Sequence, residues 1–325
     1  MAATAATTKN WGNMNNIIKI ALCASITLAT APSAMAFEGG VAPYPAGATA
    51  IGIAEMPPIP GIFLLDQTNI SNAGALYDAN GNKQTIPPFK MSAISNTPRI
   101  LISYPVTLPG GGHLFSQIVP PIVFLNTEVF GQKAHTSGLA NLTITPVMAA
   151  WSVTPALHIA TGFDFILPTG SYSATKAGVA TGYTTYSPVL ALRYDNPHGL
   201  DIGVANRLLL NTKNGRTGYQ SGNAYVADYI AGWNFGPLKL GAAGGFLDEY
   251  ANDRANGATL AHSEQETFSA GPSVTYSGLA FGKMPFIVNA NYQVDVIAKN
   301  AAKANGFWFN IAVPLFAAPP AAPGS

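Results

Sequence analysis

The chain has 325 residues, of which 48% are hydrophobic and only 10% are charged, and its formal net charge is +1. Typical soluble domains carry about 25% charged residues. A balance this close to neutral argues against nucleic acid or an acidic surface as a partner, and the low charge content directs attention to a membrane.

The N-terminus has the features of a secretory signal peptide over residues 1–36. In chain order they are an extension over residues 1–13, a start at Met14, a positive residue at Lys19, an apolar stretch over 20–30 and a small-x-small site over 34–36. We expect cleavage between Ala36 and Phe37. The apolar stretch is shorter than the roughly 20 residues that a membrane-spanning helix needs.

Cleavage would leave 289 residues, enough for one large barrel or about two ordinary domains. It would remove Cys23, the only cysteine, so the mature chain would have neither a thiol nor a disulfide. It would also remove Lys9 and Lys19, which changes the formal net charge to −1. The mature chain contains no uninterrupted apolar run of helix-spanning length, so its apolar residues are spread over short segments.

Residues 37–60 are rich in glycine and proline. They include Tyr44-Pro45 and the run from Met56 to Pro60, so we do not expect continuous strand pairing here. The segment either lies in the periplasm or enters the lumen of a barrel as a partial plug, and the sequence does not choose between the two.

Twelve segments with the character of β-strands follow, and they predict a barrel over residues 61–316. They are 62–72, 99–107, 114–125, 141–151, 156–167, 183–194, 200–211, 224–235, 239–247, 267–277, 286–296 and 307–315. Single-chain bacterial barrels have an even number of strands, and the last segment would close the wall. The tail, residues 317–325, is rich in alanine and proline, and we expect it to be disordered.

The two segments between Leu200 and Phe235 show the pattern most clearly. Apolar residues alternate with polar or small ones, which is the period of two that places one set on each face of a strand. Aromatic residues lie near the ends of the apolar face, while the opposite face mixes small residues with charged ones. This distribution is typical of a transmembrane β-barrel, in which lipid meets the outside and water the inside.

A water-soluble β-sandwich also has alternating strands and is the alternative reading. High apolarity spread through alternating segments behind an export signal favours lipid-facing side chains. We therefore predict an all-β fold, an antiparallel transmembrane β-barrel of about twelve strands, in the outer membrane of a Gram-negative bacterium, with membrane lipid as its partner. The oligomeric state is not determined by the sequence.

The sequence contains no recognisable catalytic or metal-binding motif. The five histidines are scattered without metal-ligand spacing, and His262 to Glu266 has the wrong order for a zinc-hydrolase helix. The glycines of Gly241 to Gly245 lie on a strand with no helix after it, so small residues that leave room in the lumen explain them better than phosphate binding. We expect neither an enzyme nor a cofactor nor a bound metal.

Charged and polar side chains that point into the lumen are the remaining candidates for function. The period-two assignment predicts that the pore-lining set is His158, Asp164, Arg193, Asp201, Arg207 and Asp228. Opposed charges across a narrow lumen either screen solutes by a transverse field or simply pair to satisfy one another. The sequence leaves both readings open.

Several short elements, in their order and spacing, resemble the family of proteins involved in the meta-pathway of phenol degradation. They are Phe37-Glu-Gly-Gly, Tyr44-Pro-x-Gly47, Pro57-Pro-x-Pro-Gly61, Leu167-Pro-Thr-Gly-Ser-Tyr172, residues 211–222 ending in Tyr219-Gln-Ser-Gly222, residues 241–250 and Gly271-Pro272. The resemblance implies an outer-membrane transporter associated with the uptake of aromatic or other hydrophobic compounds by passive diffusion through the lumen. It implies no catalytic residues.

Two other functions remain open from the sequence. A structural or surface-interaction barrel without transport would have a lumen blocked by residues 37–60. A soluble secreted β-sandwich would be a binding module found outside the membrane fraction.

Overall fold

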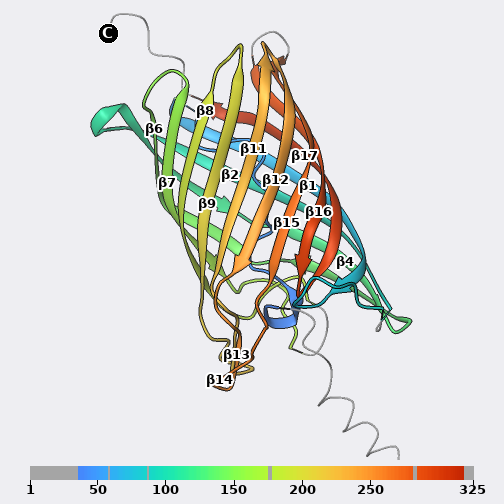
Figure 1. Ribbon diagram of the computed structural model, residues 1–325. Coiled ribbons are helices and arrows are strands. Elements are labelled where there is room, and N and C mark those ends of the chain that lie inside the picture. The colour runs from blue at the N-terminus through green and yellow to red at the C-terminus, as the bar shows by residue number, and fades with distance from the viewer. Residues whose placement is uncertain (1–35, 58, 86–87, 175–177, 281–283, 318–325) are drawn as a thin grey trace, which may run out of the picture.

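A computed structural model describes residues 36–57, 59–85, 88–174, 178–280 and 284–317. Within these residues twelve long antiparallel strands close into a barrel (Figure 1), which confirms the predicted class and strand number. Around the ring they are β1 (Gly61–Tyr77), β2 (Phe89–Leu108), β3 (Gly112–Val119), β6 (Leu142–Ser152), β7 (Leu157–Leu167), β8 (Thr185–Asp195), β9 (Leu200–Asn211), β11 (Ala224–Phe235), β12 (Leu238–Glu249), β15 (Glu266–Ala280), β16 (Met284–Lys299) and β17 (Ala301–Ala317).

The barrel closes where the first strand meets the last. In β1, Ile62 is opposite Phe316 of β17 on one side and opposite Ile102 of β2 on the other. Closure pairs the backbone N–H and C=O groups of both strands, which hydrocarbon would otherwise leave without partners. The position predicted for the closing strand is therefore that of β17.

Two further strands extend the wall: β4 (Ile122–Val129) pairs with β2, and β5 (Gln132–Leu139) pairs with β4. β3 and β4 pair with β2 in one continuous register, in which Ile118 is opposite Ile100 and Ile122 is opposite Asn96. Only Pro120 and Pro121 separate them, and proline has no N–H to donate to a ladder. The sequence predicted one strand over 114–125; the structure divides it at the two prolines and extends it at both ends.

The two ends of the barrel differ in the length of their connections. Residues 153–156, 196–199 and 236–237 make short turns at one end, and residues 168–174 with 178–184, 212–223 and 250–265 belong to long loops at the other. In the long loops, β10 (Tyr219–Gln220), β13 (Arg254–Ala255) and β14 (Ala258–Thr259) form a small separate sheet (Figure 1).

The helices of the described residues are two 3₁₀ turns, η1 (Glu38–Gly40) and η2 (Pro109–Gly111). Among these residues no helix has the length and apolarity needed to span a membrane.

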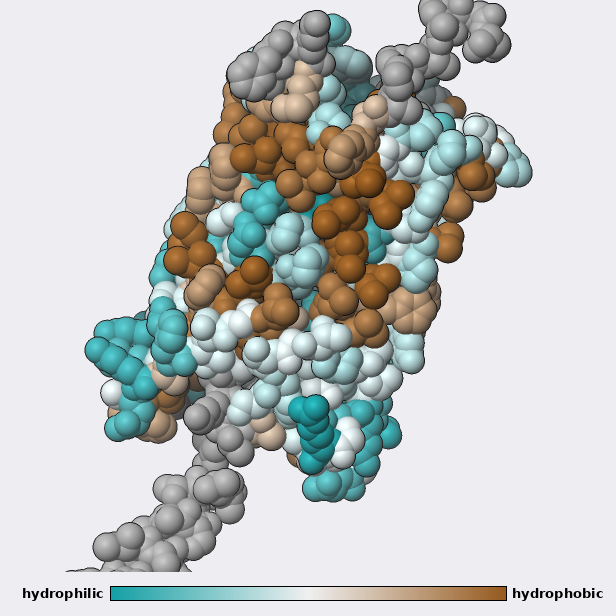
Figure 2. Space-filling model, turned by 180° about the vertical axis from the view of Figure 1, so that it is seen from behind, coloured by the Kyte–Doolittle hydropathy of each residue, from teal (hydrophilic) through white to brown (hydrophobic). Residues whose placement is uncertain are grey.

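The outward face of the barrel is mainly apolar. Leu192, Ile202 and Trp233 are 40%, 50% and 49% exposed, although each is a large apolar side chain. Figure 2 shows extensive apolar surface on the barrel, with polar surface gathered toward the loop end. Exposed apolar residues around a closed barrel match lipid rather than water.

A polar group on β1 and β2 interrupts this face. Asp66, Thr68 and Asn96 alternate along β1 and β2 with residues that line the lumen, so they point outward. The Asn96 amide donates to both oxygens of Asp66 at 3.0 and 3.1 Å and to the Thr68 hydroxyl at 3.1 Å. Polar side chains are visible amid the apolar ones on the face seen in Figure 2.

The chain before β1 lies inside the barrel. The amide of Ala36 donates to the carbonyl of Asn300 at the loop end, and Glu55 forms an ion pair with Arg193 near the short turns. Residues 36–57, called the luminal segment below, therefore run through the lumen from the loop end to the end where β1 begins. The sequence left two locations open for this segment, the periplasm and the lumen. In the structure the segment lies in the lumen.

Candidate functional site

All six residues predicted to line the pore lie on the lumen side of β7, β8, β9 and β11. Asp164, Arg193, Asp201 and Asp228 are each at most 4% exposed, and Arg207 is 8% exposed. His158 shares the face of Asp164 on β7. The structure brings five of the six into two clusters, and both clusters hold the luminal segment.

The first cluster lies around Asp228 in the middle of the barrel. Its carboxylate accepts hydrogen bonds from the Tyr44 hydroxyl at 2.5 Å, the Gly47 amide at 2.6 Å and the Thr49 amide at 3.2 Å. All three donors belong to the luminal segment, so one wall carboxylate fixes a turn of six residues. Hydrogen bonds to a charged acceptor are the strong ones.

Arg207 joins this cluster to the neighbouring wall. Its guanidinium lies 3.7 Å from the centre of the Tyr44 ring, and its Nη1 is 3.0 Å from the Asp164 carboxylate. Arg207 thus makes an ion pair across β9 and β7 and a cation–π contact with the luminal segment.

The turn at Gly47 requires both its own glycine and a glycine opposite. Gly47 has a φ of +83°, and a Cβ on Gly245 of β12 would lie 2.1 Å from the Gly47 nitrogen. Gln67 donates to the carbonyl of Ala48 at 2.7 Å, and Gln293 donates to the carbonyl of Gly47 at 2.9 Å. Within residues 241–245, Gly245 therefore makes room in the lumen for the luminal segment.

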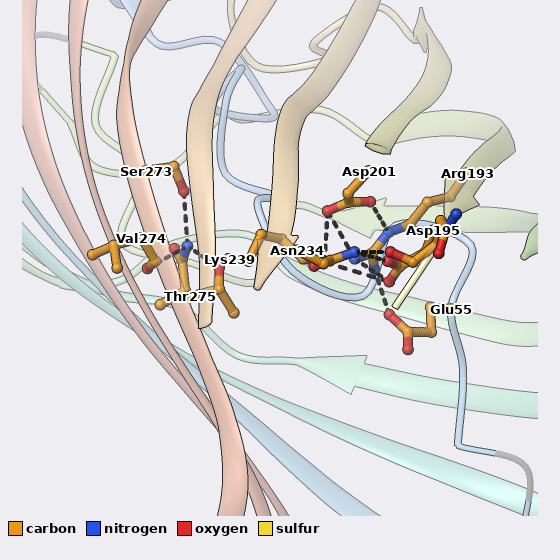
Figure 3. Close-up of polar contacts among 11 residues, drawn as sticks. Glu55, Arg193, Asp195, Asp201, Asn234, Lys239, Ser273, Val274 and Thr275 are labelled. Carbon is orange, nitrogen blue, oxygen red and sulfur yellow. Dashed lines mark hydrogen bonds and ion pairs between the residues drawn. The ribbon is translucent and has the colours of Figure 1, made fainter. Parts of the chain in front are cut away.

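The second cluster surrounds Arg193 near the short turns (Figure 3). Arg193 is paired with Glu55 at 2.5 Å, with Asp195 at 2.9 Å and with Asp201 at 2.8 Å. Lys239 of β12 adds a second cation, 2.5 Å from Asp201. Glu55 belongs to the luminal segment, so this cluster holds the segment's other end.

His158 takes no part in either cluster. Its Nδ1 lies 3.0 Å from the hydroxyl of Ser152, beside the turn that joins β6 to β7.

A chain of polar side chains that sequence reasoning missed crosses the wall from β2 to β9. The Nε of Arg99 donates to Gln117, whose amide donates to the Thr145 hydroxyl at 2.7 Å, and Thr145 donates to Asp164. Asp164 in turn accepts from Arg207. The predicted strand begins at Arg99, whereas β2 begins ten residues earlier, at Phe89.

A cavity of about 490 Å³ separates the luminal segment from part of the wall. Its apolar lining includes Ile53 and Met56 of the segment and Met91, Leu125 and Met148 of the wall. Arg99, Gln117 and Thr145 line it too. Among the described residues no group of three or more histidine, cysteine, aspartate or glutamate side chains is arranged to hold a metal ion.

A closed twelve-stranded barrel with an apolar exterior and polar clusters inside is an outer-membrane β-barrel, here with its lumen occupied by its own N-terminal segment. The chain belongs to the family described as "Putative MetA-pathway of phenol degradation", whose model matches residues 73–311.

One of the similar solved structures shows the same architecture. The COG4313 outer membrane channel from Pseudomonas putida F1 superposes with a TM-score of 0.70 at 16% identity, over 81% of this chain and 98% of that one. The translocator domain of the autotransporter NalP from Neisseria meningitidis gives a TM-score of 0.47 at 12% identity, over 82% and 92% of the two chains, and we draw nothing from it. A search of curated proteins found no match.

Proposed function

We propose that this barrel is an outer-membrane channel through which small aromatic or otherwise hydrophobic compounds enter by passive diffusion. The observation that carries the proposal is the cavity beside the luminal segment, because barrel interiors are ordinarily polar. Ile53, Met56, Met91, Leu125 and Met148 instead give this part of the lumen an apolar lining suited to an apolar solute.

The comparisons support the same reading. The family description refers to phenol degradation, and the solved structure with a TM-score of 0.70 is an outer membrane channel. A protein route has a physical use, since the polar outer leaflet slows apolar molecules while a barrel offers a way past it. None of this requires catalysis by the barrel.

In this proposal the luminal segment is a plug that yields during passage. Asp228 holds its middle and Arg193 holds its end, through the contacts to Tyr44 and Glu55. The charged residues predicted to line the pore then control entry by holding the segment, in addition to any effect of their field on the solute.

A structural or surface-interaction barrel without transport is the second candidate. The observation that favours it is the extent of the luminal segment, which is held at Ala36, Tyr44 and Glu55 and so occupies the lumen from end to end.

Solute entry into liposomes that contain the purified, refolded barrel distinguishes the two. We expect protein-dependent entry of a slowly permeating neutral aromatic amide to exceed that of glutarate, a charged aliphatic solute of similar size. Asp228→Ala, which frees the middle of the luminal segment, should raise the rate, whereas Asp248→Asn, a carboxylate that makes no contact with the segment, should not. Heat-modifiable migration on a gel establishes that each sample is folded. No entry of either solute through folded wild type and folded Asp228→Ala would refute the channel.

A further inference from the structure

Three arginines line the lumen within the described residues, and they differ in their partners. Arg193 is paired with three carboxylates, and Arg207 is paired with Asp164 and lies over the Tyr44 ring. Arg99 forms no ion pair with any described residue; its Nε donates to Gln117, an uncharged amide. Its terminal nitrogens make no hydrogen bond to a described residue, so they are available to an external acceptor.

The polar chain from Arg99 to Asp164 decides which end of the chain can bind an external acceptor. Each member donates to the next, from Arg99 to Gln117, to Thr145 and to Asp164. Asp164 is already shared with Arg207, so its charge is committed at the far end. The near end is a guanidinium whose Nε is held by Gln117, on a residue that lines the cavity.

A guanidinium in a largely apolar cavity is costly unless an anion compensates it. The planar fork matches a carboxylate, which it binds through two parallel hydrogen bonds. The other arginine of the lining, Arg207, is already paired with Asp164, and the lining near β2, β3 and β4 includes the apolar side chains of Met91, Ala93, Val119, Val123 and Leu125. A molecule that matches both the Arg99 guanidinium and the apolar lining has one negative charge and an apolar body.

We infer that the cavity is a binding site for small amphipathic monocarboxylates, such as aromatic carboxylates, with the carboxylate on Arg99 and the apolar body between Met56 of the luminal segment and the wall. The cavity of about 490 Å³ lies within the size range of small-molecule pockets, about 300–1,000 Å³. This inference rests on the proposed function and narrows its substrate class. It makes the luminal segment part of the binding site as well as part of the plug.

The test measures binding of benzoate and of its neutral isostere benzamide to the refolded barrel in a nonionic detergent, by equilibrium dialysis. At neutral pH we expect benzoate to bind at least about tenfold more tightly than benzamide, since a charge-assisted pair adds about 1.4 kcal/mol or more. Arg99→Gln should abolish that preference and leave the binding of benzamide within about twofold. Arg99→Lys, which keeps the charge and loses the fork, should retain part of the preference.

Arg254→Gln is the matched control, because Arg254 is exposed in the loop sheet and does not line the cavity. Heat-modifiable migration again establishes folding, and Arg99→Lys decides the matter if Arg99→Gln does not fold. Equal binding of benzoate and benzamide to wild type, or an unchanged preference in a folded Arg99 variant, would overturn the site.

The failure of this inference is distinguishable from failure of the channel. Entry of the neutral aromatic amide into liposomes without any preference for benzoate would overturn the carboxylate site and leave the channel standing. Arg99-dependent binding of benzoate with no entry of any solute would establish the site and refute the channel.

Discussion

Removing the Asp228 carboxylate should release the middle of the luminal segment. Asp228→Ala leaves the Tyr44 hydroxyl and the amides of Gly47 and Thr49 without the carboxylate that accepts their hydrogen bonds. Hydrogen bonds to a charged group are worth about 1.5–3 kcal/mol each, and they are not additive. Removing one partner of a buried charged group costs about 3–5 kcal/mol.

The lower end of that range sets the expected size of the effect. About 3 kcal/mol corresponds to roughly a hundredfold increase in the population of the released segment. The contacts of Gln67, Gln293 and Arg193 with the segment survive the change, so part of the increase is suppressed. We therefore expect an increase of at least about tenfold.

A single introduced cysteine reports this release. The mature chain is expected to lack cysteine, and Ala50 of the luminal segment is 4% exposed, so Ala50→Cys should react slowly with a small maleimide in the folded barrel. Asp228→Ala should raise the labelling rate by at least about tenfold, whereas Asp248→Asn should leave it unchanged. An unchanged rate in folded Asp228→Ala would refute the reasoning that this carboxylate holds the segment.

The remaining predictions concern the opposing glycine, the outward polar group and the loop sheet. Gly245→Ala places a Cβ against the Gly47 nitrogen and should accelerate the same labelling of Ala50→Cys while the barrel keeps its heat-modifiable migration; slow labelling would contradict the close approach. Asp66→Leu removes an outward-facing carboxylate from the lipid-facing wall and should raise the free energy of unfolding in bilayers by about 1 kcal/mol, measured by guanidinium titration. A loss of stability would show that the contact with Asn96 outweighs the cost of placing the carboxylate against lipid. The pKa of the Tyr219 phenol is raised above its ordinary value of about 10 by burial and by its hydrogen bond to Asp253. A raised pKa means that this contact stabilises the folded loops fully below pH 10 and is lost as the pH rises through the higher folded value. Tyr219→Phe should abolish that alkaline loss of protection from proteolysis of residues 212–223, and an identical alkaline profile would assign the loss to other groups.

The sequence by itself determined the solvent on each side of the wall. Alternation in β9 and β11 separates Ile202 and Trp233, which face lipid, from Asp201 and Asp228, which face the lumen, and a one-residue shift would exchange them. This information is local, because the side-chain period of a strand is two. The strand number followed from the same pattern. The pattern did not predict the division of one strand at the prolines 120 and 121, nor that β2 begins as early as Phe89.

Only the tertiary structure decided what the lumen-facing residues contact. Tyr44 and Asp228 are 184 positions apart, and Glu55 and Arg193 are 138 apart, so no spacing rule connects them. Closure of the barrel brings these strands around one narrow lumen, and the segment before β1 takes whatever partners that lumen presents. The same closure decides that Arg193 and Arg207 have carboxylate partners while Arg99 has none among the described residues. Period-two alternation assigns a side chain to the lumen, but its partner there depends on which strands closure places opposite it.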